Sequence, residues 1–155
     1  MPSTERTLVL VKPDGVARGL VGEVLRRIEG KGYRLVALEL RRATPELLAE
    51  HYAEHAGKPF YDPLVEFMLS GPVAALVAEG QRVIEGFRSL AGATDPTVAA
   101  PGSIRGDFAV ETAQNLVHAS DSPENAQAEL ALWFRPEELL GYEREIDRWV
   151  LAPEE

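Results

Sequence analysis

Short apolar runs recur along this chain and predict the strands of a sheet. Residues 7–11, Thr-Leu-Val-Leu-Val, form a continuous apolar run with β-branched side chains, which is typical of a buried central strand. Residues 34–40 and residues 73–77 have the same chemistry. Residues 115–118 form a shorter fourth run, so the sequence predicts that His118 lies at the end of a strand.

Between these runs, apolar residues at helical spacing predict the helices. Positions 21, 24, 25 and 28 are apolar, which is the spacing of one helix face, and Gly30 and Gly32 follow where that helix ends. Thr44-Pro45 is a helix start, with threonine as the N-cap and proline in the first turn, and this helix runs towards Gly57. The other predicted helices are a short one after Pro63, one over residues 81–90, one that starts at Ser122-Pro123, and one from Arg135 to Trp149.

The order of these elements predicts an α+β fold. Residues 92–104 contain Gly, Thr, Pro, Ala and Ser without periodicity, so we expect a long surface loop of the kind that is usually functional or disordered. The resulting order, β-α-β-αα-β-α-loop-β-α-α, favours a sandwich of one antiparallel sheet with helices on one face. The chain contains no repeat or linker, and we expect residues 1–155 to form a single domain.

Composition limits the partners of this domain. No apolar run approaches the roughly 18 residues that a membrane span requires, and the amino terminus lacks the pattern of a secretory signal. The absence of cysteine excludes disulfides and thiol chemistry and is consistent with a cytoplasmic location. The 16 basic and 25 acidic side chains give a net charge of −9. Such a surface repels nucleic acid and anionic membranes, yet it leaves room for a small phosphorylated ligand in a locally basic cleft.

The candidate nucleophile lies in the segment Asn115-Leu-Val-His118-Ala-Ser120-Asp121-Ser122. Of the three histidines, only His118 is surrounded by small and hydroxyl-bearing residues, with an acid eleven positions on at Glu129. A neutral imidazole is a competent nucleophile near pH 7, because its unperturbed pKa is about 6.5. A carboxylate partner on its other nitrogen would fix the tautomer and make the attacking nitrogen more basic. The alternative, a histidine that only packs and hydrogen-bonds at a strand end, stays open on this segment alone.

Positive side chains at the ends of predicted elements favour phosphate chemistry. Lys12 ends the first strand, Arg88 lies on the helix before the long loop, and Arg105 lies at the exit of that loop. Phosphoryl transfer needs cations where the transferred oxygens accumulate negative charge. No Gly-rich phosphate loop of the common nucleotide-binding kinds is present, so side chains and the long loop would have to hold any nucleotide.

A transition-metal site is the competing interpretation for the other two histidines. His51 and His55 would share one helix face at positions i and i+4, which suits a metal such as zinc. Only Glu54 or Asp62 could supply a third ligand nearby, so we favour ordinary surface and groove histidines, and the role of Glu54 stays unassigned.

The motifs together resemble those of the nucleoside diphosphate kinases from Thr7 to about Trp149. Beside the histidine segment, the chain contains, in order, Leu10-Val-Lys12-Pro13-Asp14-Gly15, His51-Tyr52, Lys58-Pro59-Phe60-Tyr61, Ser70-Gly71-Pro72-Val73, Gly92-Ala-Thr94-Asp95-Pro96 and Pro101-Gly102-Ser103-Ile104-Arg105-Gly106-Asp107-Phe108. The resemblance implies a ferredoxin-like βαββαβ fold, with helices packed on a four-stranded antiparallel sheet. It also implies a ping-pong exchange of the γ-phosphoryl group between nucleotides through a phosphohistidine, which maintains nucleoside triphosphate pools.

The same resemblance assigns roles to individual residues. The catalytic set that it implies is His118 as the nucleophile with Lys12, Tyr52, Asn115, Ser120 and Glu129. In this set Lys12 contacts the ribose and the transferring phosphate, Tyr52 positions Lys12 and the γ-phosphate, and Asn115 holds the sugar. Glu129, with Ser120, orients His118 through its second nitrogen. The nucleotide-binding set that it implies is Lys12, Phe60, Arg88, Thr94, Arg105 and Asn115. Phe60 would stack on any base, which gives a physical reason for broad nucleobase tolerance.

The resemblance also implies a cofactor and an assembly, and it shows where this chain departs from the family. Mg²⁺ would arrive with the nucleotide and contact Asp121 through water. The loop around Pro96 and Pro101 and the extension over residues 150–155 would lie at subunit contacts, so we expect a hexamer, with a tetramer as the alternative. Gln114 stands where the family often has arginine, a change that weakens local positive charge without removing a catalytic group.

Three other function classes compete with the kinase. A nucleic-acid-binding regulator is disfavoured by the acidic balance and by the lack of a basic stripe interleaved with aromatic residues. A catalytically silent binding module would have lost the nucleophile or the phosphate ligands, and both are present. A phosphohistidine relay protein would leave Phe60 and Asn115 without a purpose.

Overall fold

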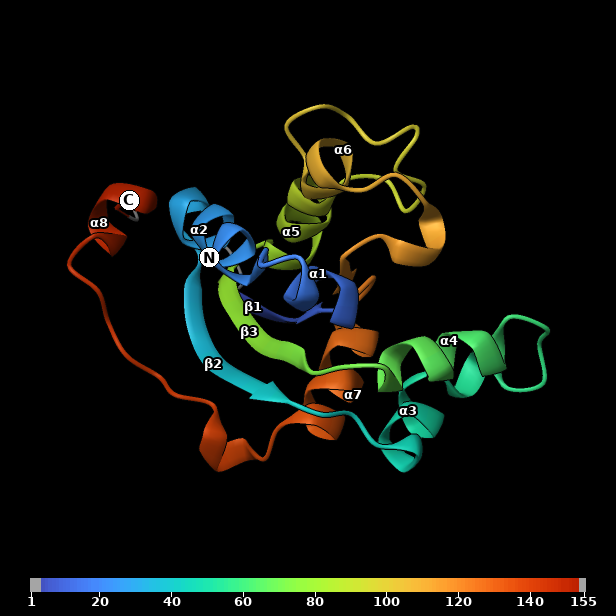
Figure 1. The fold of residues 1–155 in the computed structure, drawn as a ribbon. Helices are drawn as coiled ribbons and strands as arrows, with labels where there is room; N and C mark the ends of the chain where they lie inside the picture. Colours follow the sequence, from blue (N-terminus) through green and yellow to red (C-terminus); the bar gives the residue numbers. More distant parts are fainter. Residues whose placement is uncertain (1–3, 154–155) are drawn as a thin grey trace.

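The computed structural model describes residues 4–153 and builds them around one four-stranded sheet (Figure 1). Its strands are β1 (Thr4–Val11), β2 (Arg34–Arg41), β3 (Val73–Gln81) and β4 (Val117–Ala119). Their order is β2-β3-β1-β4, and every neighbouring pair is antiparallel. With helices between β1 and β2 and between β3 and β4, this is the ferredoxin-like βαββαβ arrangement that the resemblance implies. The last two residues of the expected extension over residues 150–155 lie outside the described residues.

The predicted helices are confirmed up to α7, and two short ones were not predicted. The helices are α1 (Pro13–Ala17), α2 (Val21–Lys31), α3 (Pro45–His51), α4 (Tyr61–Leu69), α5 (Val83–Ala91), α6 (Ile104–Phe108), α7 (Pro123–Trp133) and α8 (Asp147–Val150), with single turns η1 (Ala53–His55), η2 (Thr112–Gln114) and η3 (Pro136–Glu138). The predicted caps are present, because Thr44 Oγ1 accepts from the amide of Leu47 and Ser122 Oγ accepts from the amide of Asn125. None of the described helices is long and apolar enough to cross a membrane.

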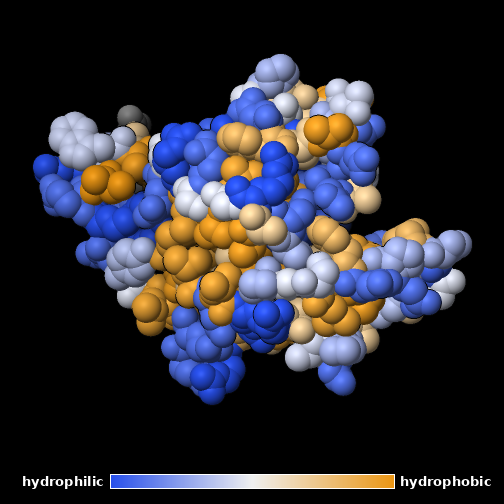
Figure 2. Space-filling view, in the orientation of Figure 1, coloured by the Kyte–Doolittle hydropathy of each residue, from blue (hydrophilic) through white to orange (hydrophobic). Residues whose placement is uncertain are grey.

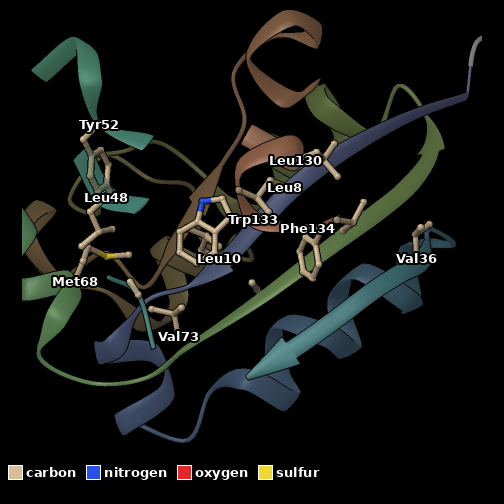
Figure 3. Close-up of a cluster of buried hydrophobic side chains, with 13 residues drawn as sticks. Leu8, Leu10, Val36, Leu48, Tyr52, Met68, Val73, Leu130, Trp133 and Phe134 are labelled. Carbon is tan, nitrogen blue, oxygen red and sulfur yellow. The ribbon is translucent and has the colours of Figure 1, made fainter. Parts of the chain in front are cut away.

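Helices cover both faces of the sheet, so the expectation of helices on one face is wrong. Leu8 and Leu10 of β1 point into a cluster with α3, α4 and α7, whereas Val9 and Val11 point into a second cluster with α2 and α5. All four of these side chains are fully buried. Figure 3 shows part of the first cluster, in which side chains from the end of α7 gather beside Leu8 and Leu10. A continuous apolar run, rather than an alternating one, is the sequence pattern of a strand buried on both faces.

The predicted helix from Arg135 to Trp149 is also wrong. Only η3 and α8 form there, and the chain between them runs extended beside β2 (Figure 1). The amide of Leu140 donates to the carbonyl oxygen of Val36, and the guanidinium of Arg34 donates to the carbonyl oxygen of Tyr142. Gly141 interrupts the apolar spacing in this segment, and contacts with β2 satisfy backbone groups that a helix would have paired internally.

Candidate active site

The pairing of β1 with β4 places the candidate nucleophile on the face that α7 covers. His118 lies directly opposite Leu10 in the ladder, and directly opposed side chains of an antiparallel pair point to the same face. Because side chains alternate along a strand, Ser120 follows on that face two residues later. Leu10 packs under α7, so both polar side chains point towards that helix.

On that face, His118, Ser120 and Glu129 form one hydrogen-bonded group. Nε2 of His118 lies 2.9 Å from Oε1 of Glu129, and the Ser120 hydroxyl donates to the same oxygen at 2.7 Å. Ser120 is fully buried, and its Oγ accepts from the backbone amide of Leu8 at 3.2 Å. Burial alone would raise the pKa of Glu129, but the hydrogen bonds from His118 and Ser120 and the charge of His118 together lower it. The sequence segment and Glu129 are thus brought together as expected.

This group determines which nitrogen of His118 can attack. An ionised carboxylate only accepts, so the hydrogen bond to Glu129 places the imidazole proton on Nε2. Nδ1 then carries the lone pair, and within residues 4–153 it has no hydrogen-bond partner. The histidine is about one-fifth exposed, with a side-chain exposure of 18%. The arrangement therefore offers an accessible nitrogen nucleophile with a carboxylate behind it.

A strained turn leads into β4. Leu116 has φ of 77°, in the left-handed region that side chains with a Cβ rarely adopt. The amide of Val117 donates to the carbonyl oxygen of Asn115 at 2.9 Å, which closes a three-residue turn around Leu116. Oδ2 of Asp14 accepts from the Leu116 amide, and the Leu116 carbonyl accepts from the amide of Lys12. Contacts on both sides hold this conformation, which no local sequence pattern predicts.

The turn brings the side chains of Lys12 and Asn115 into contact. Nζ of Lys12 donates to Oδ1 of Asn115 at 2.9 Å, and Nδ2 of Asn115 donates to the carbonyl oxygen of Thr94 at 3.0 Å. Asn115 is buried, so its amide ties the end of β1 to the long loop. The expected neighbour of Lys12, Tyr52, lies in the same cleft, but Lys12 makes its hydrogen bond to Asn115.

Arg105 holds the same region from the opposite side. Its guanidinium donates to the carbonyl oxygens of Asn115 at 3.2 Å, Gly92 at 2.9 Å and Val117 at 2.7 Å. The residue is 7% exposed. A guanidinium has five N–H groups, so two remain for a ligand after these three bonds. Arg105 therefore both fixes the loop and presents positive charge.

These side chains line one cleft of about 660 Å³. Its walls include all the residues proposed from the sequence to bind nucleotide, namely Lys12, Phe60, Arg88, Thr94, Arg105 and Asn115. Phe60 is 49% exposed at the rim, where its ring meets that of His55 with centroids 5.2 Å apart. Lys58 Nζ lies 5.9 Å from the centre of the Phe60 ring. The cleft thus has an aromatic rim and a basic floor beside the nucleophile, which suits a nucleotide.

Comparison with known proteins decides the family. The sequence model described as nucleoside diphosphate kinase matches residues 5–139 of the chain. The chain belongs to the nucleoside diphosphate kinase family. It is 66% identical to a nucleoside diphosphate kinase of Nocardia farcinica over 132 residues, which cover 84% of this chain and 95% of that protein. It is 56% identical to a nucleoside diphosphate kinase of Thermomicrobium roseum over 148 residues, which cover 96% and 99%.

Solved structures agree with this placement. A nucleoside diphosphate kinase family protein from Babesia bovis superposes with a TM-score of 0.93 at 48% identity, over 95% of this chain and 99% of that one. A halophilic nucleoside diphosphate kinase from Halobacterium salinarum, in complex with CDP, superposes with a TM-score of 0.94 at 47% identity, over 97% and 100%. The predicted family and fold are confirmed, and the chain functions as a nucleoside diphosphate kinase.

The cations of this kinase repel one another in the absence of substrate. Burial, and then the charge of Arg105, lower the pKa of Lys12 to about 8, against the opposing effect of Asp14. Burial, and then the charge of Arg88, lower the pKa of Arg105 to about 10. A bound phosphate would therefore stabilise the charged forms of both groups, because it compensates their mutual repulsion and their lost hydration.

The kinase site also contains residues whose part in it the sequence did not reveal. The ring of His51 lies 4.6 Å from the ring of His118, and the Trp133 indole donates to Nδ1 of His51 at 3.0 Å. The sequence placed His51 in a family motif without a role, and a metal pair with His55 was the less favoured interpretation. Since 82 positions separate His51 from Trp133, no local pattern connects them.

Proposed function

We propose that His118 carries the phosphoryl group in a two-step exchange. In the first step, the lone pair of Nδ1 attacks the γ-phosphorus of a nucleoside triphosphate. The bond from phosphorus to the β-phosphate oxygen breaks, and the nucleoside diphosphate leaves with that electron pair. In the second step, a terminal phosphate oxygen of an acceptor diphosphate attacks the phosphohistidine, and Nδ1 recovers its lone pair. The observation that carries the proposal is the hydrogen bond of His118 Nε2 to Glu129, which leaves Nδ1 as the free nucleophile.

The surrounding side chains take the charges of this transfer. In the proposal, Lys12, Arg88 and Arg105 contact phosphate oxygens with the hydroxyl of Thr94 beside them, because all four line the cleft next to His118. Tyr52 lines the same cleft, and its proposed role is to position Lys12 and the γ-phosphate. Lowered pKa values of Lys12 and Arg105 support phosphate binding there, since a bound anion offsets the cost of keeping both groups charged.

Base and sugar take the remaining parts of the cleft. Phe60 stacks on the base, since its ring is half-exposed at the rim. Every base has a π-face, so this contact accepts all of them. The side chain of Asn115 contacts the ribose together with Lys12, to which it is already hydrogen-bonded.

Magnesium fits this site as a companion of the nucleotide. The carboxylate of Asp121 lines the cleft and uses Oδ1 to accept from Asn125, which leaves Oδ2 for a water-mediated contact. Mg²⁺ prefers oxygen ligands and retains waters, and phosphate oxygens with one such carboxylate match that preference. Bound magnesium would neutralise phosphate charge, and Asp121 would orient it.

We further propose that residues 1–155 form one kinase domain that assembles as a hexamer, with a tetramer as the alternative, and works in the cytoplasm. Support for self-association comes from β2, an edge strand on which Leu38 and Leu40 are 52% and 66% exposed. Figure 2 shows a hydrophobic patch over this strand. An exposed apolar patch on an edge strand is a common site of contact with another chain.

The test of the catalytic proposal needs no acceptor at first. The protein is mixed with magnesium and γ-labelled ATP, and the label on the protein is tested for lability in acid and stability in alkali. We expect a label that maps to residue 118, transfers to added GDP, and is absent from His118→Ala. A folded His118→Ala protein that is labelled like the parent would refute the role of His118.

A further inference from the structure

His51 is a buried histidine in direct contact with the nucleophile. Its ring meets that of His118 edge to face, with centroids 4.6 Å apart and planes at 69°. It also meets the ring of Tyr52 at 4.6 Å and that of Trp133 at 5.7 Å. Three rings therefore confine its plane, and its Nδ1 accepts from the Trp133 indole at 3.0 Å.

This hydrogen bond fixes the tautomer of His51. An indole N–H can only donate, so Nδ1 must present a lone pair and the proton must lie on Nε2. Trp133 is rigidly held, since it is 1% exposed and its carbonyl oxygen and ring both contact the Arg41 guanidinium. His51 therefore stays neutral as long as its bond to Trp133 is intact.

The hydrogen bonds of His51 and His118 also disfavour a metal site here. A nitrogen of His51, a nitrogen of His118 and an oxygen of Glu129 lie within 4.8 Å of one another, as ligands of an ion could. However, Nδ1 of His51 is occupied by Trp133 and Nε2 of His118 donates to Glu129. A metal would have to displace a proton or break one of these bonds, so the cluster is built for hydrogen bonding.

A charged His51 would disturb the nucleophile. Protonation at Nδ1 would break the bond to Trp133 and place a cation beside the carboxylate of Glu129. That cation would compete with His118 for Glu129 and weaken the bond that directs the lone pair to Nδ1 of His118.

We propose that His51 is a positioning residue that Trp133 holds neutral, so that Glu129 remains committed to His118. The proposal rests on the role of His118 as phosphoryl carrier given above. The indole of Trp133 and the carboxylate of Glu129 lie one turn apart on α7, so a single helix orients both histidines.

The charged and titratable groups around His51 are consistent with this role. Those around it are Tyr52 after α3, His118 on β4, Glu129 on α7, Lys12 after β1 and His55 on η1. Burial, and then the charge that His118 can carry, lower the pKa of His51 to about 3, while Glu129 opposes this effect. The Trp133 donor adds to the effect of burial, because its hydrogen bond occupies Nδ1, so removing that donor favours a proton on Nδ1.

The first experiment measures the rate of His118 phosphorylation in single turnover, with the Trp133→Phe variant of the full chain. The ratio of variant to parent rate is followed from about pH 8 to about pH 5.5, which cancels the ionisations that both proteins share. We expect a loss of about twofold or less at the alkaline end and a further loss of about twofold at the acidic end, because burial still opposes the proton that the missing donor no longer excludes. Trp149→Phe is the matched control, because Trp149 is 78% exposed, and its ratio should stay flat.

The second experiment separates titration of His51 from loss of packing. Asparagine at position 51 keeps an acceptor near Nδ1 but has no ionisable ring. We expect His51→Asn to be slower by a pH-independent factor, and the double variant His51→Asn/Trp133→Phe to lose the acid-specific effect of Trp133→Phe. An acid-specific loss that persists in the double variant, or a flat ratio in a folded Trp133→Phe protein, would overturn the proposal.

The controls keep the two proposals distinguishable. Thermal unfolding shows whether each variant is folded under assay conditions, and the His51→Asn comparison remains decisive if Trp133→Phe does not fold. In that case, a rate ratio for His51→Asn that changes with pH would overturn the role of His51 as a neutral positioning residue. Failure of the carrier role of His118 appears in the parent protein instead, as a label that is absent or survives His118→Ala.

Discussion

Glu129 and Trp133 lie one helical turn apart on α7, and each holds one histidine of the site. Glu129 accepts from Nε2 of His118 at 2.9 Å, and Trp133 donates to Nδ1 of His51 at 3.0 Å. Residues four apart on a helix share one face, so the helix presents an acceptor and a donor side by side. The two partners impose opposite demands, because an acceptor places a proton on the facing nitrogen and a donor excludes one.

Replacing the acceptor should slow phosphorylation without unfolding the protein. In Glu129→Gln, an amide that both donates and accepts no longer selects the His118 tautomer, so we expect the labelling rate from ATP to fall by about 10-fold to 100-fold. Rapid quenching with labelled ATP measures this rate. Glu124→Gln, on an exposed position of the same helix, is the control and should label like the parent. A labelling rate of Glu129→Gln equal to that of the control would contradict the assignment.

Two serines near the nucleophile should behave differently. Ser120→Ala removes a buried hydroxyl that bridges Glu129 and the Leu8 amide, so we expect both a slower labelling rate and a loss of about 1–3 kcal/mol in the free energy of unfolding. Ser122→Ala removes only the N-cap of α7, which should lower stability by about 1 kcal/mol and leave the labelling rate unchanged. Urea unfolding and quenched labelling of both variants test this difference. Equal labelling rates in the two variants would exclude a role for Ser120 in orienting Glu129.

Much of the fold could be predicted because local patterns determined it. The caps at Thr44 and Ser122 and the continuous run at residues 7–11 correctly predicted two helix starts and the central strand. The helix predicted from Arg135 to Trp149 was wrong. Its apolar spacing suits a helix in isolation, but Arg34 and the carbonyl groups of β2 bind the segment in an extended form. The prediction of helices on one face only was wrong. The continuous apolar run of β1 already indicated a strand that is buried on both faces.

The sequence predicted only those residues of the site that belong to a recognisable motif. Family resemblance brought Lys12, Asn115 and His118 into one hypothesis, and the structure places all three in one cleft. The conformation of Leu116 and the bond between His51 and Trp133 depend on partners from distant strands and helices. No spacing in the sequence encodes such contacts, since they arise only after the chain has packed.

Arg105 and Arg88 provide a second contrast. The three carbonyl contacts of Arg105 cannot be made by a lysine, so Arg105→Lys should lower the free energy of unfolding by about 2–4 kcal/mol as well as weakening nucleotide binding. Within residues 4–153, the side chain of Arg88 makes no hydrogen bond or ion pair, so Arg88→Lys should weaken binding and leave stability unchanged. Denaturant unfolding and calorimetric titration with ADP test both variants. A stable Arg105→Lys protein would argue against its structural part.

Phe60 should affect affinity for nucleotides but not the transfer step. In Phe60→Ala, loss of stacking should raise KM for purine and pyrimidine nucleotides alike by about tenfold and leave kcat within about twofold. Steady-state kinetics with ATP as donor and GDP or CDP as acceptor check this. Labelling by inorganic tripolyphosphate, a donor without a base, serves as the control and should be unaffected. An increase in KM confined to one base would replace stacking with specific recognition.

Nucleotide affinity should fall at alkaline pH because Lys12 loses its charge. Its pKa is lowered to about 8 in the free protein, and a bound phosphate stabilises the charged form and raises that pKa. Binding is therefore strongest below about pH 8, where Lys12 is already protonated, and weakens as the pH rises above it, because binding must then recruit a proton. Between about pH 7 and about pH 9 we expect the Kd for ADP to increase by about tenfold. Calorimetric titration in buffers of different ionisation enthalpy measures both the Kd and the protons taken up. Lys12→Gln should bind more weakly at pH 7 and lose this pH dependence, so the same alkaline loss in Lys12→Gln would assign the ionisation to another group.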